Sequence, residues 1–245
     1  ITNGSFSSFT GWTDASTGSA SASASGGLLV LTATGFNRAS AKQTISVALA
    51  DRNVEHGLRI KVTRGPIMVK LGSTAGSTNL LPGGRAAQLD DGDHSIAFTP
   101  TTASIFLEIY HELPRTLYVD SCTIDAAGTL VLETPWATAD ITDNLIRYEQ
   151  SIDVLYVASS VYQQREIQRR GDTAWGVQRY KSDDGPFVAS DGTVTLNPNT
   201  FTGNGTLTAS QAFFMTGMVG RLFRLVQSGQ TADFTFTTAP AEGPY

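Results

Sequence analysis

Apolar and polar residues alternate with a period of two through much of the first half of the chain. In the stretch GLRIKVT at 57–63, every second residue is aliphatic and the others are mostly charged or polar. Such alternation is typical of a β-strand with one buried face and one wet face. The runs at 94–100, 104–112 and 116–125 read in the same way, with turn residues between them. About eight strands at regular spacing before Ala126 predict an antiparallel sandwich or jelly roll.

The composition and the strand pattern of the sequence change after this region. Pro135 and a mixture of Ala, Thr and Asp indicate a connector, and strand candidates follow at 145–160, 164–171 and 174–181. Three strands in a meander are similar to most of one β-propeller blade, whose faces and edges need neighbours. A further β-rich stretch follows it.

The sequence therefore predicts an all-β protein built in three parts. These are an N-terminal antiparallel jelly-roll sandwich at 1–126, a propeller-blade-like β meander at 127–187 and a small β-rich segment at 188–245. We place the first boundary near Asp125 to Gly128, where the strand pattern gives way to the connector.

Composition excludes several classes of partner. The 245 residues carry a net charge of −5 with no cluster of basic residues, so we expect no nucleic-acid binding. No apolar run reaches the roughly 18 residues of a membrane helix, so we expect no membrane insertion. The single cysteine, Cys122, lies in a strand pattern and is predicted to be a buried apolar residue. Because the chain begins at Ile1 without a signal-peptide pattern, we expect a piece of a longer polypeptide.

Residues that would support catalysis are sparse. The three histidines, His56, His94 and His111, lack the spacing of a metal cluster, and we interpret them as surface residues. The acidic run LDDGDH at 89–94 has the composition of a tight turn. No nucleophile motif is present, so the chain is not expected to be an enzyme.

A candidate sugar-binding surface comes from the polar sides of two strands. Arg59 and Lys61 alternate outward from one strand, and Glu108 and Tyr110 alternate outward from another. If the two strands belong to one sheet, their donors, acceptor and ring share a surface that would suit a carbohydrate; the alternative is an ordinary solvated sheet face. Trp12 is interpreted as a core residue because of the large area that its ring buries.

The first half of the chain carries a family resemblance. The motifs NGSF at 3–6, GWT at 11–13 and TLYVDSCTID at 116–125 resemble the galactose-binding-like jelly-roll modules that often serve as carbohydrate-binding modules. Such modules often hold a structural calcium between their first and last strands. Asp120 matches the acidic position in the last strand, whereas Ser5 stands where an acidic residue is common in the first. The site thereby loses a charged ligand, so we expect no cofactor; a structural calcium at Asp120 is the alternative that the resemblance implies.

A second resemblance concerns residues 134–187. The segments TPWATADI, RYEQSIDVLYVAS, REIQRRGDTAWGV and DDGPF, in that order, resemble tail proteins of tailed bacteriophages and prophages, including the short-tail nozzle family. This resemblance implies a non-enzymatic structural component of the virion tail. Its partners would be other tail subunits, in a homo-oligomeric ring, or the remainder of a longer chain, with a glycan of the host surface as a ligand of the jelly roll. The alternative is a carbohydrate-binding module of a glycan-active enzyme whose catalytic domain lies outside this chain.

Overall fold

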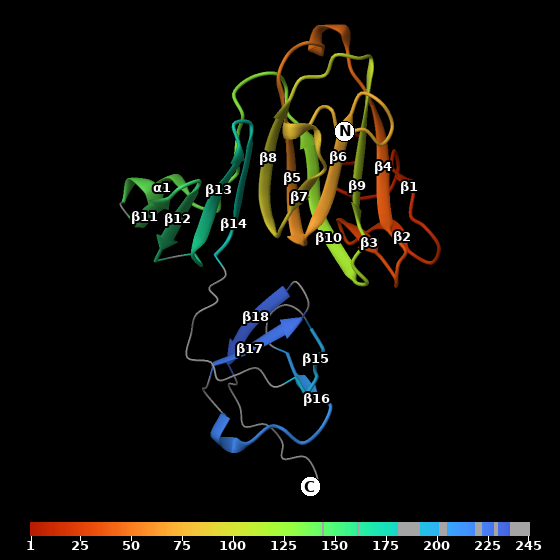
Figure 1. Ribbon diagram of the computed structural model, residues 1–245. Helices are drawn as coiled ribbons and strands as arrows, with labels where there is room; N and C mark the ends of the chain where they lie inside the picture. Colours follow the sequence, from red (N-terminus) through yellow and green to blue (C-terminus); the bar gives the residue numbers. More distant parts are fainter. Residues whose placement is uncertain are drawn as a thin grey trace. The chain divides into compact units, whose positions relative to one another are not determined.

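A computed structural model describes most of the chain (Figure 1). The described residues are 1–143, 145–160, 162–180, 192–200, 205–218, 222–227 and 230–235. Nearly all their regular structure is β-strand, as the alternation predicts. The chain divides into two compact units, 1–180 and 181–245. Among the described residues, no helix has the length and apolar character needed to cross a membrane.

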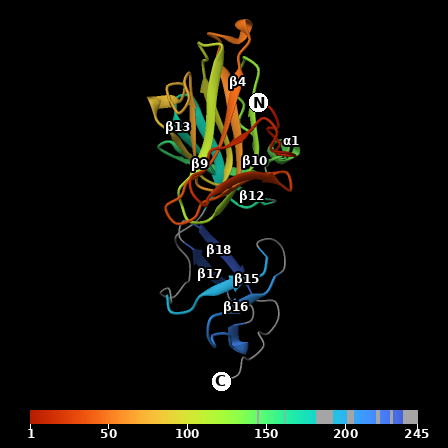
Figure 2. The same ribbon diagram turned by 90° about the vertical axis from the view of Figure 1, so that its right-hand side faces the viewer.

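The first unit contains a sandwich of two antiparallel sheets. The first sheet has the order β1 (Thr13–Asp14), β4 (Ala39–Ser46), β9 (Ser104–His111), β6 (Ile67–Gly72) and β7 (Ala87–Leu89). Strands β4 and β9 of this sheet lie side by side in Figure 2. The facing half of the second sheet has the order β8 (Gly92–Phe98), β5 (His56–Arg64), β10 (Thr116–Ile124), β3 (Leu28–Thr32) and β2 (Ser21–Ser25). This arrangement is the predicted antiparallel jelly-roll sandwich.

The aliphatic positions of the alternating pattern fill the space between the two sheets. Leu58, Ile60 and Val62 of β5 are at most 2% exposed, and they pack in the same core as Leu107 and Ile109 of β9. Because successive side chains of a strand point to opposite faces, the polar residues between them must lie on the outer face of each sheet. The core therefore fixes which side chains each outer face presents.

Two predictions about single residues are confirmed. Trp12 is 6% exposed, its ring lies 5.4 Å from that of Phe6, and its indole N–H donates to the carbonyl oxygen of Thr2 at 3.0 Å. Cys122 is fully buried, and this burial raises the pKa of its thiol to about 12. The thiol therefore stays protonated and serves as a small apolar core group.

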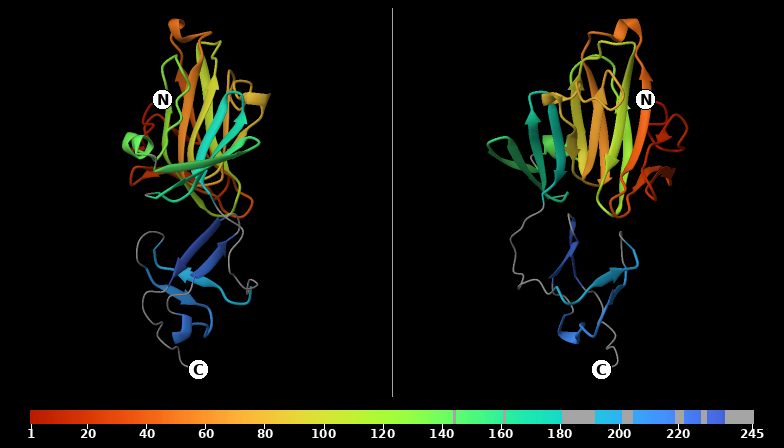
Figure 3. Two further views of the ribbon diagram at one scale, coloured as in Figure 1. Left: turned by 90° about the vertical axis from the view of Figure 1, so that its left-hand side faces the viewer. Right: turned by 45° about the vertical axis from the view of Figure 1, so that its right-hand side comes forward.

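The meander has four strands and continues the second sheet. They are β11 (Ile146–Ser151), β12 (Val154–Ser159), β13 (Arg165–Gly171) and β14 (Ala174–Arg179). Strand β14 pairs with β8, so the sheet runs from β11 to β2 over nine strands. Figures 1 and 3 show the meander, coloured green to teal, continuing from this edge of the sandwich.

This pairing changes the expected domain organisation. The predicted boundary near residue 126 falls inside one compact unit, 1–180. An edge strand carries a row of backbone N–H and C=O groups that require partners, and β14 supplies them for β8. The blade-like meander thus finds the neighbour that it needs within the same chain, at one of its two edges.

The second unit is described by two short hairpins. Strands β15 (Leu196–Pro198) and β16 (Leu207–Ala209) form one, and β17 (Leu222–Gln227) and β18 (Gln230–Thr235) form the other. Both hairpins agree with the all-β fold class, and the unit that contains them runs from 181 to 245. The DDGPF element at 183–187 lies outside the described residues.

Candidate functional site

The structure separates the four residues proposed for sugar binding into two pairs. Arg59 and Lys61 lie on β5 of the second sheet, whereas Glu108 and Tyr110 lie on β9 of the first sheet. The expectation that they share one surface is therefore wrong. Apolar and polar residues alternate along both strands as predicted, but this pattern does not predict which strands become neighbours in a sheet. Each pair occupies the outer face of its own sheet.

Glu108 is the centre of a charged cluster on the outer face of the first sheet. Its carboxylate is only 4% exposed and lies 3.1 Å from the guanidinium of Arg38, 3.8 Å from Lys42 Nζ and 3.7 Å from Lys70 Nζ. Ser40 donates its hydroxyl hydrogen to the same carboxylate at 2.8 Å. A carboxylate is buried at an outer sheet face only when it is paired and hydrogen-bonded in this way.

The strand register explains how these charges meet. Glu108 of β9 lies directly opposite Lys42 of β4 on one side and Lys70 of β6 on the other. Side chains in such directly opposed positions have Cβ atoms about 4.5–5.5 Å apart, and opposite charges there attract. The two lysines therefore cover the carboxylate from both neighbouring strands.

Tyr110 stands next to this row and is held by the same cations. The guanidinium carbon of Arg38 lies 4.9 Å from the centre of its ring, and Lys70 Nζ lies 4.7 Å from it, both within the range of cation–π attraction. Burial raises the pKa of the phenol, with smaller effects of the charges on Glu112 and Glu108 in the same direction. The phenol is therefore neutral at ordinary pH and its hydroxyl can donate a hydrogen bond.

Apolar groups and a loop border the cluster. Met68 lies opposite Tyr110, and Phe106 lies opposite Gly72 of β6; Met68, Phe106 and Tyr110 are all partly exposed. A Cβ atom at Gly72 would lie 1.9 Å from Ser77 Oγ, so the glycine allows the loop after β6 to fold closely against the strand. We name Arg38, Ser40, Lys42, Lys70, Glu108 and Tyr110 the β9 cluster.

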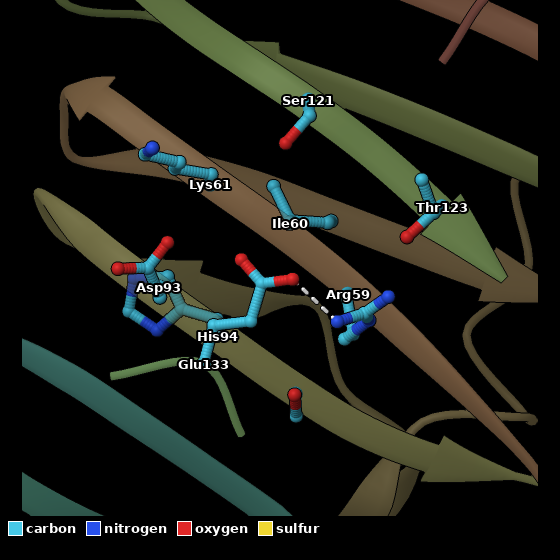
Figure 4. Close-up of a pocket in the computed structure, with 9 residues that line it drawn as sticks. Arg59, Ile60, Lys61, Asp93, His94, Ser121, Thr123 and Glu133 are labelled. Atoms are coloured by element: carbon cyan, nitrogen blue, oxygen red, sulfur yellow. Dashed lines mark hydrogen bonds and ion pairs between the residues drawn. The ribbon is translucent and has the colours of Figure 1, made fainter. Parts of the chain in front are cut away.

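Arg59 and Lys61 lie in a small pocket on the outer face of the second sheet (Figure 4). Arg59 pairs with Asp125 at 3.0 Å and with Glu133, and Figure 4 shows Glu133 reaching toward it. Lys61 lies 3.8 Å from Asp120. Asp125 and Glu133 belong to the connector after β10, so Arg59 ties this connector to the sheet.

The pocket beneath the connector is narrow. The Ser95 hydroxyl donates to the carbonyl oxygen of Val131, which fixes the connector over β8. This hollow is partly open to solvent and its volume is about 80 Å³, whereas ligand pockets commonly measure about 300–1,000 Å³. Burial raises the pKa of Asp93, which also lines the pocket. The ion pairs with Asp125 and Glu133 give Arg59 a structural role in holding the connector against the sheet.

Asp120 is an exposed partner of Lys61. Its side chain is 43% exposed, and the lysine ammonium lies 3.8 Å from its carboxylate. Across the described part of the chain, no group of three or more His, Cys, Asp or Glu residues has the geometry to hold a metal ion. The described side chains therefore give the calcium implied by the resemblance no set of acidic ligands around Asp120.

The interpretation of the three histidines as surface residues is wrong. His56, His94 and His111 are 6%, 2% and 1% exposed and lie within β5, β8 and β9. Each buried ring has a nitrogen within hydrogen-bond distance of a backbone carbonyl oxygen, which compensates for lost water: His56 lies beside Asp51 and Asp125, His94 beside Asp90, and His111 beside Leu31. Burial lowers the pKa of His94 to about 4 and lowers that of His111.

Sequence reasoning found two members of the β9 cluster and missed the others. Lys42 and Lys70 occupy outward positions of strands, so alternation could have marked them as exposed, but only the strand order brings them beside Glu108. Arg38 lies just before β4, outside the strand, and carries no periodic signal. Ser40 is fully buried at an outward position, an exception that the pattern does not predict.

Comparisons with known proteins give limited similarity. No protein-family model matches the chain, and no curated protein matches it. A solved structure described as "CBM4 structure and function" is 16% identical, covers 51% of this chain and 99% of its own, and has a TM-score of 0.33. A second, a mutant family 29 carbohydrate-binding module complexed with cellulohexaose, is 9% identical, covers 49% of this chain and 82% of its own, and has a TM-score of 0.29. The sandwich assignment rests on the strand pairing of this chain itself.

Proposed function

We propose that this protein is a non-enzymatic glycan-binding protein whose ligand lies across the β9 cluster. The observation that carries the proposal is the buried carboxylate of Glu108, held with Tyr110 among three cations on an outer sheet face. Burying such a cluster contributes little to stability, because the desolvation of the charges offsets their attraction. A fixed set of donors beside partly exposed rings is, however, what orients a polar ligand.

The cluster suits a sugar better than a chemical reaction. Glu108 already accepts from Ser40 and three cations, so it has no free role as a general acid or base. A sugar chain offers hydroxyl groups for hydrogen bonds and C–H faces for apolar contact. Arg38, Lys70 and Tyr110 can form hydrogen bonds with the sugar hydroxyls. Met68 and Phe106 beside them can make apolar contacts with the C–H faces.

A matched pair of tyrosine substitutions tests this proposal. Tyr110→Ala should weaken glycan binding at least about tenfold, since it removes the ring that orders two of the cations. Tyr118→Ala, at a half-buried position on β10 of the other sheet, is the control and should leave binding unchanged. A glycan array followed by calorimetry on the best ligand gives the affinities, and equal losses in both variants would contradict the proposal.

The setting that we propose for this glycan-binding module is a virion tail. Support comes from the resemblance of the ordered motifs at 134–187 to tail proteins and from strand β11. Among the described residues β11 pairs only with β12, and five of its six residues are exposed. An exposed edge strand is a ready template for pairing with another chain. Other tail subunits or a second copy would be the partners.

The alternative is a binding module attached to a glycan-active enzyme, with the catalytic domain outside this chain. Both settings use the β9 cluster in the same way and differ in what continues the polypeptide. Sequencing the parent reading frame distinguishes them. Further β-rich tail units would support the tail, and a catalytic domain would support the enzyme.

A further inference from the structure

The β9 cluster presents more hydrogen-bond donors than acceptors. Arg38, Lys42 and Lys70 carry three positive charges and donate only, whereas Glu108 is the one carboxylate among them and is 4% exposed. The three cationic side chains are 25%, 42% and 21% exposed, so they remain within reach of a ligand. Part of their hydrogen-bonding capacity therefore faces outward while the acceptor is enclosed.

The surroundings of the Tyr110 ring add to this predominance of donors over acceptors. Arg38, just before β4, and Lys70, on β6, approach the ring from the two sides of β9, and both lie within 5 Å of its centre. Both cations lie over the ring and so occupy space that a stacked sugar would need. Recognition here depends on charge and donors more than on stacking.

A neighbouring acidic residue reduces the excess of positive charge in the β9 cluster but does not remove it. Glu112 continues the outward side of β9 two residues beyond Tyr110 and is exposed. Three cations against Glu108 and Glu112 leave a positive local balance on a chain whose net charge is −5. Such a local reversal of sign attracts anionic ligands, and the attraction weakens with salt.

We propose that the ligand of the β9 cluster is an acidic glycan, one that carries carboxylate or sulfate groups. This inference rests on the proposed function and adds the chemical class of the sugar. The anionic groups accept hydrogen bonds from Lys42, Lys70 and Arg38, and charge-assisted bonds of this kind are stronger than those to neutral hydroxyls. Glu108 holds the cations in place between β4 and β6 and acts as a positioning residue.

Three polysaccharides of different charge provide the test with the intact chain. Polygalacturonate, dextran sulfate and uncharged dextran are compared by calorimetry and by retention in affinity gels at low and moderate salt. We expect binding to an acidic polymer, little binding to dextran, and affinity that falls as salt rises. Binding to dextran sulfate alone would identify sulfate as the recognised group, and binding to polygalacturonate would identify carboxylate.

Substitutions then locate the charges that matter. Lys42→Gln and Lys70→Gln should each weaken binding to the acidic polymer by about tenfold, because each removes a charge-assisted hydrogen bond. Arg179→Gln removes the same charge from an exposed position on β14 and should leave binding unchanged. A thermal melt of each variant confirms that it folds.

The two proposals fail in different ways. Equal, salt-insensitive binding to charged and uncharged polymers would overturn the acidic specificity and leave glycan binding intact. Equal weakening by Arg179→Gln would show general charge attraction and also overturn the specificity. Binding to no glycan of any charge on a broad array would overturn the proposed function itself.

Discussion

At the scale of single residues, position in the strand pattern and chemical surroundings must be read together. Alternation correctly placed Glu108 and Tyr110 on the outward side of β9, yet it gave no sign that Glu108 would be buried. The burial comes from Lys42 and Lys70 on the neighbouring strands, which are distant in sequence. His56 and His111 show the same limit, because each ring lies beside a backbone carbonyl, of Asp125 and Leu31, that is distant in sequence.

His94 makes stability depend on pH below neutrality. Its pKa is about 4 in the folded protein and 6.5 in an unfolded chain, because burial disfavours the charged ring. Above pH 6.5 both states are neutral and the group has no effect. As the pH falls from 6.5 toward 4, the unfolded state takes up the proton first, so the free energy of unfolding should decrease by up to about 3 kcal/mol.

Urea denaturation at several pH values measures this effect. His94→Gln retains an N–H donor for the Asp90 carbonyl and does not titrate, so its stability should decrease less between pH 6.5 and 4 than that of the parent chain. Buried His111, whose pKa is also lowered, remains in both proteins and contributes in the same direction. Parallel pH profiles for parent and variant would contradict the assignment to His94.

At the scale of elements, the strands themselves were largely predictable and their partners were not. The runs at 57–63, 104–112 and 116–125 became β5, β9 and β10 because each carries a period of two, which in β10 changes phase after Val119, where the pairing with β5 shifts register. Strand order depends on which edges meet in three dimensions. The separation of β5 and β9 into different sheets, which divided the predicted sugar-binding surface, could not be derived from alternation.

The junction of β8 and β14 depends on a glycine. A Cβ atom at Gly176 would lie 2.7 Å from His94 Nδ1 and 3.1 Å from its Cε1, so Gly176→Ala should displace the buried ring or the strand. We expect a loss of about 1–3 kcal/mol, the usual effect of overpacking. Thermal unfolding combined with limited proteolysis should show earlier loss of the meander β11–β14.

Gly171→Ala is the matched control for this substitution. It lies at the end of β13, and a Cβ atom there would meet nothing closer than Pro82 Cβ at 4.0 Å. Its melting temperature should remain close to that of the parent chain. If both alanine variants are equally stable, the close contact of Gly176 with His94 is not important for the junction.

At the scale of the whole molecule, the sequence predicted an all-β chain and the structure shows one, with a different grouping of its parts. Residues 1–180 form a single compact unit because β14 completes the edge of β8. This leaves β11 as the end strand of the nine-stranded sheet. The unit thus carries two outer surfaces of interest, the β9 cluster on one sheet and the β11 edge on the other.

Assembly through the β11 edge predicts self-association that depends on concentration. Tyr148 is 72% exposed within β11, and Ile152 beside the strand is 87% exposed. Tyr148→Lys should reduce association, since a lysine on an edge strand opposes pairing with a second chain. Light scattering over a range of concentrations measures it, with Phe36→Lys, another fully exposed aromatic position, as the control. A chain that is monomeric at all concentrations would contradict self-pairing.

The central claim is that a glycan binds across the outer face of the first sheet. The most direct test is to titrate the isotope-labelled chain with an acidic oligosaccharide and to map the amide chemical-shift changes onto the strands. Binding at this face should produce changes concentrated on β4, β6 and β9, around Ser40, Lys70 and Tyr110. Changes confined to β5, β8 and β10, or none with acidic or neutral sugars, would contradict it.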